Sequence, residues 1–269
     1  MRIPVASAAM WASTLLAAQQ PIPDPVALIK EVQAHQLAVD EIRENFTFQE
    51  IVRTEQLNAD GSVRTSATEA REVFFINGRR VFRLLKKNGT ELSAAESKSE
   101  QARVNKLLLA DMKAPPPQTR NGLRLISQIL AVTKLSNTRV VTLKGRETLA
   151  FDFAGDPAAR AHGIEQNVAK KLVGTIWIDR ADRQVARVEV HFNDTYKLGG
   201  GLLANIQKGT MVTVEQAPVG EGLWLQTAND QHVTARVLVK SERRNVHIQD
   251  FDFRRFDVAT LQTINPVLP

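Results

Sequence analysis

The sequence predicts a mainly β protein of the α+β class: a strongly curved antiparallel sheet, or half-open β-barrel, with helices on its concave face. Two observations support this prediction. About ten segments alternate apolar and polar residues and are joined mostly by short turns, which is typical of an antiparallel sheet. A sheet that wide twists and curls, and its apolar side needs a cover. Segments with helical spacing near 25–44, 123–134 and 164–173 are the candidates for that cover.

Composition agrees with a globular protein. The chain has 269 residues, of which 43% are hydrophobic and 24% charged, so a packed core is expected. Chains rich in β-structure commonly form one domain at about this length, and we expect a single domain over 21–269. The chain has no cysteine, which excludes disulfides, thiolate metal sites and a cysteine nucleophile. Its net charge of +6 permits an anionic partner.

Residues 1–20 resemble a secretory signal peptide. One basic residue, Arg2, precedes the apolar run Ile3–Ala18, and a polar stretch with Pro21 follows. The run is short for a membrane span and is diluted by proline, serine and threonine. We therefore expect a periplasmic or secreted protein, with an uncleaved anchor or an ordinary helix as alternatives.

The first half of the mature chain predicts a helix followed by a meander. The helix over 25–44 begins after Asp24, a favourable N-cap, with proline in its first turn. Period-two patterns then predict strands over 46–57, 63–76 and 79–86. Asn77-Gly78 joins the last two strands as a tight hairpin turn.

A charged helical insertion is expected at about 92–122. Ser93 and Glu96 have the spacing of a capping box, which marks a helix start. Val104, Leu107 and Leu108 give this helix only a thin apolar stripe. Three consecutive prolines at 115–117 end it.

The second half is read as strands with one short helix between them. The expected helix covers 164–173, and the expected strands cover 140–143, 149–153, 174–179, 185–192, 211–217, 223–227, 232–240 and 245–256. In the strand 149–153, Phe151 and Phe153 share one face with Leu149.

One segment resembles a known family. Gly174-Thr175-Ile176-Trp177-Ile178-Asp179, a short turn and then Gln184–Val190 are similar to the central hairpin of the outer-membrane lipoprotein carrier (Lol-type) superfamily. The order of elements over 45–256 also fits that superfamily. The resemblance implies a half-open barrel that is lined with apolar side chains and lidded by helices. The insertion at 92–122 departs from the family pattern.

If the helices fill the concavity only in part, an apolar cavity remains that could hold an acyl chain. The predicted ligand-binding residues are strand aromatics together with an apolar segment beside three glycines, where the leucines could touch cargo or a membrane surface. These residues are Phe151, Phe153, Trp177, Leu198, Leu202, Leu203 and Ile206.

No pattern predicts catalysis, and no catalytic residue, metal or cofactor is expected. The sequence lacks a Gly-x-Ser-x-Gly elbow, a P-loop and a His-Glu-x-x-His motif. Asp250 and Asp252 alternate with phenylalanines, so both are expected on a solvated face. The basic residues are dispersed, which does not favour nucleic acid as a partner.

The sequence therefore predicts an exported, non-enzymatic binding protein that holds a lipid or the acyl chain of a lipoprotein, with a transient membrane contact. The alternative is an interaction or structural module of the cell envelope with the same fold and a filled core. A hydrolase that uses Asp or His on strands is a third class, without a supporting motif.

Overall fold

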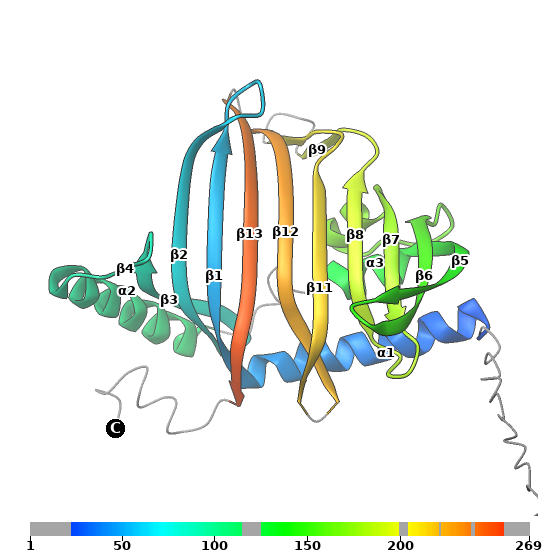
Figure 1. Cartoon of the computed structure of the whole chain (residues 1–269), viewed down its shortest axis with the longest axis horizontal. Helices are drawn as coiled ribbons and strands as arrows, with labels where there is room; N and C mark the ends of the chain where they lie inside the picture. The colour runs from blue at the N-terminus through cyan, green and yellow to red at the C-terminus, as the bar shows by residue number, and fades with distance from the viewer. Residues whose placement is uncertain (1–22, 115–124, 199–203, 221, 238–239, 256–269) are drawn as a thin grey trace, which may run out of the picture.

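A computed structural model describes residues 23–114, 125–198, 204–220, 222–237 and 240–255 (Figure 1). The described part of the chain forms one 13-stranded sheet. Its strands are β1 (Phe46–Leu57), β2 (Val63–Ile76), β3 (Arg79–Lys87), β4 (Thr90–Glu91), β5 (Thr133–Leu143), β6 (Arg146–Gly155), β7 (Leu172–Asp179), β8 (Val185–Phe192), β9 (Tyr196–Leu198), β10 (Ala204–Ile206), β11 (Met211–Gly220), β12 (Leu223–Val237) and β13 (Lys240–Arg255).

The sheet is antiparallel and open. Its spatial order is β4-β3-β2-β1-β13-β12-β11-β8-β7-β6-β5, with β10 attached to β12 and β9 attached to β10. β4 and β5 stand at the two ends of this order and do not pair with each other in the described sheet. The predicted fold class, a mainly β protein with a large antiparallel sheet not closed into a barrel, is confirmed.

The helices of the described chain are α1 (Pro25–Ile42), the short 3₁₀ turn η1 (Arg43–Asn45), α2 (Ala94–Lys113), α3 (Leu125–Val132) and α4 (Gly163–Ala169). The helices lie against one face of the sheet, except for α2, which packs at its β3 edge. α1 begins where the Asp24 side chain accepts a hydrogen bond from the backbone N–H of Ala27, the expected N-cap. It then runs across the strands near one end of the sheet (Figure 1).

The main hydrophobic core lies between α1, α3 and α4 and the β5–β11 half of the sheet. α1 contributes Leu28 and Val32, α3 contributes Ile129, and the strands contribute Phe151 and Ile176, all with at most 1% of their surface exposed. Tight packing of this kind excludes water and ligands alike. One half of the concave face is thus filled, and the three predicted cover segments, 25–44, 123–134 and 164–173, all contribute to its filling.

α2 protects the β3 edge of the sheet. The Glu100 carboxylate accepts a hydrogen bond from the backbone N–H of Leu84, and Arg103 donates one to the carbonyl of Phe82, at 2.7 Å each. Val104 and Leu108 of α2 form a second small core with Phe74 and Val81. The predicted charged insertion therefore provides hydrogen-bond partners for backbone groups of the edge strand β3 that would otherwise be unpaired.

Turn chemistry agrees with the sequence in two hairpins. Asn77-Gly78 and Lys144-Gly145 adopt positive φ at both positions, 49° and 76° in the first pair and 50° and 80° in the second. Such turns match the twist of the flanking strands. Asn88 also has positive φ, and its side chain accepts a hydrogen bond from the backbone N–H of Thr68 at 2.8 Å.

Three elements differ from the sequence-based expectation. β12 is one continuous strand over Leu223–Val237, where two strands, 223–227 and 232–240, were expected. β5 begins at Thr133 rather than 140, because the chain passes directly from α3 into a strand that is irregular around Asn137, whose φ is 50°. α4 ends at Ala169, and Leu172 already pairs with Phe192 in the sheet. The predicted signal peptide, residues 1–20, lies outside the described residues.

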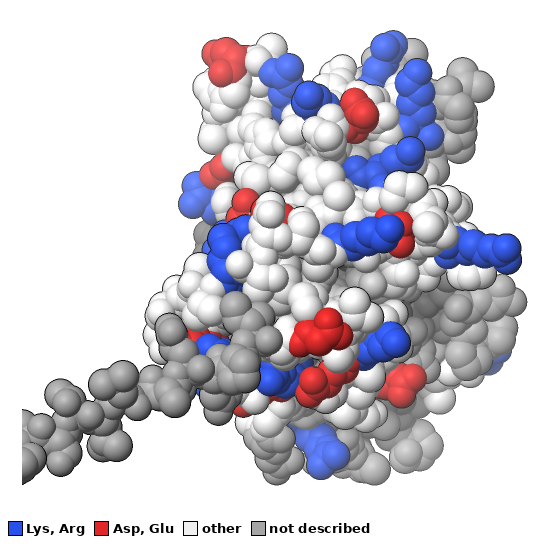
Figure 2. All heavy atoms as spheres, turned by 90° about the vertical axis from the view of Figure 1, so that its right-hand side faces the viewer, with Lys and Arg blue, Asp and Glu red and all other residues white. Residues whose placement is uncertain are grey.

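Charged side chains of both signs are interspersed on the side of the molecule formed by β5 and its neighbours, with uncharged surface between them (Figure 2). Ion pairs join adjacent strands in this region, such as Arg139–Asp152 at 2.7 Å between β5 and β6. Pairs of this exposed kind add little stability, about 0–1 kcal/mol each, and serve mainly solubility.

Candidate functional site

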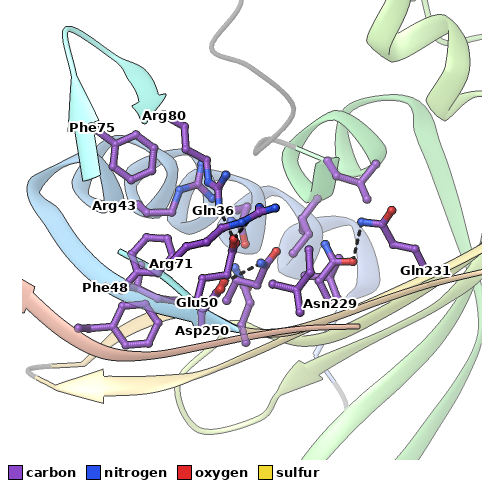
Figure 3. A pocket seen from close by; sticks show the side chains of 18 residues that line it. Gln36, Arg43, Phe48, Glu50, Arg71, Phe75, Arg80, Asn229, Gln231 and Asp250 are labelled. Carbon is purple, nitrogen blue, oxygen red and sulfur yellow. Dashed lines mark hydrogen bonds and ion pairs between the residues drawn. The ribbon is translucent and has the colours of Figure 1, made fainter. Parts of the chain in front are cut away.

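A cavity occupies the half of the concave face that the main core leaves unfilled. It measures 460 Å³ and lies between the helices and the strands β1, β2, β3, β11, β12 and β13 (Figure 3). Eight apolar and ten polar or charged residues line it: Phe48, Phe75, Leu125, Ile126, Val214, Leu225, Ile248 and Phe253, and Gln36, Arg43, Glu50, Arg71, Arg80, Gln216, Gln226, Asn229, Gln231 and Asp250.

One wall of the cavity is aromatic. The Phe48 ring lies 5.3 Å from that of Phe253 and 6.5 Å from that of Phe75, centroid to centroid. Tilted pairs at these distances are favourable aromatic contacts. α3 adds Leu125 and Ile126 on the other side. The cavity therefore offers an apolar surface that a hydrocarbon chain could cover.

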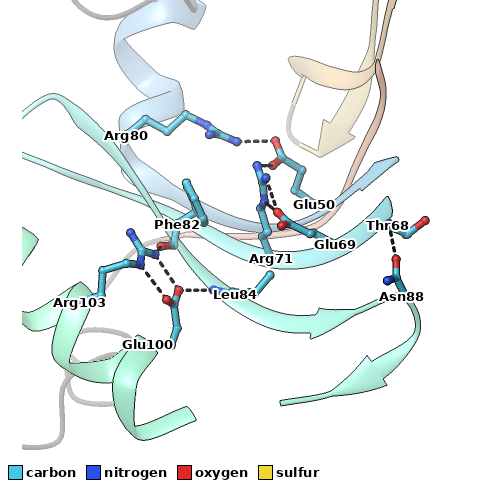
Figure 4. A network of polar contacts seen from close by, with 10 residues as sticks. All are labelled: Glu50, Thr68, Glu69, Arg71, Arg80, Phe82, Leu84, Asn88, Glu100 and Arg103. Atoms are coloured by element: carbon cyan, nitrogen blue, oxygen red, sulfur yellow. Dashed lines mark hydrogen bonds and ion pairs between the residues drawn. The ribbon is translucent and has the colours of Figure 1, made fainter. Parts of the chain in front are cut away.

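A buried ion-pair network stands beside this wall (Figure 4). The Glu50 side chain is 3% exposed, accepts a short hydrogen bond from Arg80, and is 3.4 Å from Nη1 of Arg71. Arg71 also donates to Glu69, at 2.9 Å from its Nε, and its guanidinium lies over the Phe82 ring at 4.4 Å. Burial of a carboxylate is tolerated here because two guanidinium groups compensate it.

Asp250 is the carboxyl of this cavity with the weakest support. It pairs with Glu50 across β1 and β13 and is 6% exposed. Its Oδ2 accepts a hydrogen bond from Gln226 Nε2 at 2.8 Å, whereas Oδ1 is buried without a partner in the described part of the chain. Burial, together with the negative charge of Glu50, raises the pKa of Asp250 to about 7. The amide of Gln226 and the charges of Arg80 and Arg43 oppose this rise without cancelling it.

The prediction that both aspartates lie on a solvated face is therefore wrong for Asp250. The pairing of β1 with β13 shifts register between Thr47 and Gln49, and Asp252 adopts a φ of 56° there. A bulge of this kind breaks the two-residue period. Asp250 points inward, Phe253 lies against Phe48, and Phe251 is 41% exposed.

Two buried amide oxygens of the cavity wall also lack hydrogen-bond partners among the described residues, Oε1 of Gln36 and Oε1 of Gln216. The Gln36 side chain is oriented by Asp40, which accepts from its Nε2 at 3.3 Å and from the Ser127 hydroxyl at 2.8 Å. With Oδ1 of Asp250, the cavity has three buried acceptors that its own side chains leave unsatisfied. Such groups are costly to bury unless something donates to them.

The sequence-predicted binding residues do not form this wall. Phe151 and Phe153 lie in the main core, and Ile206 packs against it. Trp177 stands between the buried Ile176 and Ile178, hence on the opposite face of β7, with the Arg187 guanidinium 5.3 Å from its ring. Leu198 is the last residue of β9, but its side chain, like residues 202 and 203, lies outside the described part. Binding at these seven residues stays a prediction.

Sequence reasoning missed the residues that do line the cavity. Glu50 follows Phe48 by two positions and precedes Val52 by two, so it stands at an inward position of an otherwise alternating strand. An acid in such a position is a recognisable signal, because it needs a buried partner. Its partners Arg71 and Arg80 come from other strands, however, and pairing register is not visible in the sequence.

Neither a metal-binding cluster nor a membrane-spanning helix occurs among the described residues. No group of three or more histidine and acidic side chains is placed to hold a metal ion. No helix in the described ranges has the length and hydropathy needed to cross a membrane.

Comparisons with known proteins give weak structural similarity. No family model matches the sequence, and no curated protein does. The fold is similar to that of a putative outer membrane lipoprotein-sorting protein domain from Vibrio parahaemolyticus, with 9% identity over 88% of this chain and 97% of that chain and a TM-score of 0.38. It is also similar to a LolA superfamily protein from Nitrosomonas europaea, with 10% identity, 88% and 99% coverage and a TM-score of 0.34.

A third similar structure is a DUF1329 family protein from Desulfovibrio piger, with 10% identity, 86% and 93% coverage and a TM-score of 0.34. These likenesses agree with the resemblance that residues 174–190 suggested. They concern the path of the chain alone.

Proposed function

We propose that this chain is an exported binding protein that holds a lipid or an acylated polypeptide in the cavity between α1, α3 and the β1–β3 and β11–β13 strands. The observation that carries the proposal is a 460 Å³ cavity with an aromatic and aliphatic wall beside a buried polar network. Ligand sites of proteins commonly measure about 300–1,000 Å³ and combine apolar walls with a few fixed polar groups.

Apolar burial would supply most of the affinity. Each methylene of an acyl chain that leaves water contributes about 0.8 kcal/mol, so a chain lying against Phe48, Phe253 and Ile248 gains several kcal/mol. The polar side of the cavity then suits the head of an amphiphile. This arrangement differs from a wholly apolar trough, and it favours ligands with one apolar and one polar end.

The proposal assigns binding rather than catalysis, and it places the protein in the periplasm or outside the cell. Export rests on the composition of residues 1–20. Acyl chains of lipids or lipoproteins are the proposed cargo, and loading or unloading such cargo requires a transient contact with a membrane. No cofactor is part of this function.

The test is displacement of a fluorescent acyl probe from the purified full chain. Ile248 is half-buried and lines the cavity, so Ile248→Trp should fill part of its volume and weaken probe binding at least about tenfold. Gln249→Trp is the matched control, because Gln249 is exposed and alternation directs it to the other face. Equal probe binding by both variants, or none by the unmodified protein, would overturn the proposal.

A further inference from the structure

Among the described residues, the cavity has one acid without a basic partner of its own. Arg43 lies 3.7 Å from Asp40, Arg80 bonds to Glu50, and Arg71 bonds to Glu69 while also approaching Glu50. These contacts pair three guanidinium groups with three carboxylates. Asp250 is left with the neutral amide of Gln226.

An ionised Asp250 would add a buried negative charge that no direct ion pair among the described residues neutralises and that Arg80 and Arg43 offset only in part. Such a charge is unfavourable unless it is paired or neutralised. In the free protein the raised pKa of Asp250 keeps the carboxyl protonated, and therefore neutral, to a higher pH than usual. A cation in the cavity would instead compensate the charge of the ionised carboxylate by pairing with it.

The uncharged acceptors beside Asp250 favour a cation that carries N–H groups. Oε1 of Gln36 and Oε1 of Gln216 line the same cavity, and both side chains are more than nine-tenths buried. An ammonium group has three donors, whereas a quaternary ammonium has none and a carboxylate offers only acceptors. Three unsatisfied oxygens therefore select a donor-rich head group.

We propose that the cavity binds amphiphiles with a primary ammonium head group, whose N–H groups donate to Asp250, Gln36 and Gln216 while the hydrocarbon chain covers the aromatic wall. This inference rests on the proposed function, because it names the chemical class of the ligand for the same cavity. Hydrogen bonds to a charged group in a buried site contribute about 1.5–3 kcal/mol, which corresponds to roughly tenfold or more in affinity.

Binding should depend on pH through Asp250. The charged groups that face it are Glu50 on β1, Arg80 on β3 and Arg43 on η1, and Gln226 on β12 bonds to it. Because the carboxyl loses its proton near pH 7, affinity for an ammonium head should rise as the pH increases from about 5.5 to about 8. An uncharged head should show no such rise.

The experiment compares four amphiphiles with the same chain, dodecylamine, dodecyltrimethylammonium, dodecanol and dodecanoate, by displacement of the acyl probe at pH 8 from the full chain. Dodecylamine should bind about tenfold or more tightly than the other three. Asp250→Asn should abolish that preference. Asp252→Asn, two positions away at the exposed bulge, should retain it.

Equal binding of all four amphiphiles would overturn the ammonium proposal and leave the acyl-binding function standing. A preference for dodecylamine that survives Asp250→Asn would overturn it as well. Binding of none of them would remove both proposals. Lysophosphatidylethanolamine and lysophosphatidylcholine are measured in parallel, because their head groups differ only in methylation of the ammonium. Tighter binding of the former would show that the cavity selects the ammonium of a phospholipid head group as well as that of a simple amine.

Discussion

Glu50 and Asp250 stand directly opposite each other in the β1–β13 pairing, yet their carboxyl groups have different surroundings. Glu50 is compensated by Arg80 and Arg71, whereas Asp250 is supported by one amide and has a pKa raised to about 7. Two inward-facing acids at one register position are unfavourable in a sheet unless one is paired or neutral. This asymmetry gives the cavity its polar character.

The first prediction concerns Asp250 and stability. Its pKa is higher in the folded protein than the usual 3.8, so the folded state binds the proton more strongly than the unfolded state. The contribution of Asp250 to the free energy of unfolding therefore falls as pH rises from about 4 to about 7, by up to about 4 kcal/mol. Asp250→Asn removes the titrating group and with it this decrease in the free energy of unfolding. Urea unfolding at pH 5 and pH 8 should show the variant gaining stability relative to wild type at the higher pH.

The control for that comparison is Asp252→Asn, which should follow the wild-type pH profile. A constant stability difference between Asp250→Asn and wild type across this pH range would mean that Asp250 titrates normally in the folded protein.

The second prediction concerns Glu50. Glu50→Gln removes the charge that compensates Arg80 and should destabilise the fold by about 1–3 kcal/mol, because the half-buried Arg80 guanidinium loses its charged acceptor. Glu69→Gln, whose side chain is 36% exposed, should cost less than about 1 kcal/mol. Chemical denaturation of both variants measures the difference, and similar losses for the two would contradict the assigned roles.

The variant also changes its neighbour. Since the Glu50 charge raises the pKa of Asp250, Glu50→Gln should lower that pKa. Titration of the Asp250 carboxyl carbon by NMR checks this shift, and an unchanged or higher pKa would count against the proposed coupling.

The third prediction concerns α2. Leu108 is 1% exposed against Phe74, and Leu108→Ala should destabilise the protein by about 2–5 kcal/mol through the cavity it leaves. The neighbouring Leu107 is 37% exposed, so Leu107→Ala should change the free energy of unfolding by about 0.5 kcal/mol or less. Thermal unfolding distinguishes them. If Leu108→Ala were equally neutral, α2 would not be packed on the sheet.

The fourth prediction concerns Gly174 in β7. A Cβ at this position would lie 1.9 Å from the backbone carbonyl oxygen of Glu189 and 3.1 Å from the Phe153 ring. Gly174→Ala thus requires displacement of a neighbouring strand and should destabilise the fold by about 1–3 kcal/mol. Gly61→Ala meets no atom within 4 Å, although its φ of 87° strains any side chain. A stability of Gly174→Ala equal to wild type would contradict the close strand approach.

Much of the fold was predictable from local patterns. The Asn77-Gly78 turn, the Ser93 capping box and the alternation around Phe151 each specify an element through short-range chemistry, and each is present. The departures occur where local patterns are ambiguous. The first half of β5 is rich in polar residues, and its pairing with β6 shifts register between Ser136 and Arg139. The two-residue alternation of a strand is therefore not visible there.

The cavity was not predictable in the same way. Its polar network joins Glu50, Arg71, Arg80 and Asp250 from four strands, and only the sheet register brings them together. Asp250 was assigned to the wrong face because one bulged residue, Asp252, shifts the alternation. The sequence left open whether the helices fill the concave face, and it gave no indication of a charged wall there.

The most direct test of the binding account is native mass spectrometry of the full chain mixed with one equivalent of a lysophospholipid, in parallel with Ile248→Trp and Gln249→Trp. We expect a one-to-one complex for the unmodified protein and for Gln249→Trp, and its loss for Ile248→Trp. Absence of a complex with the unmodified protein, or an undiminished complex with the cavity-filling variant, would contradict the claim that the space beside Asp250 is a ligand site.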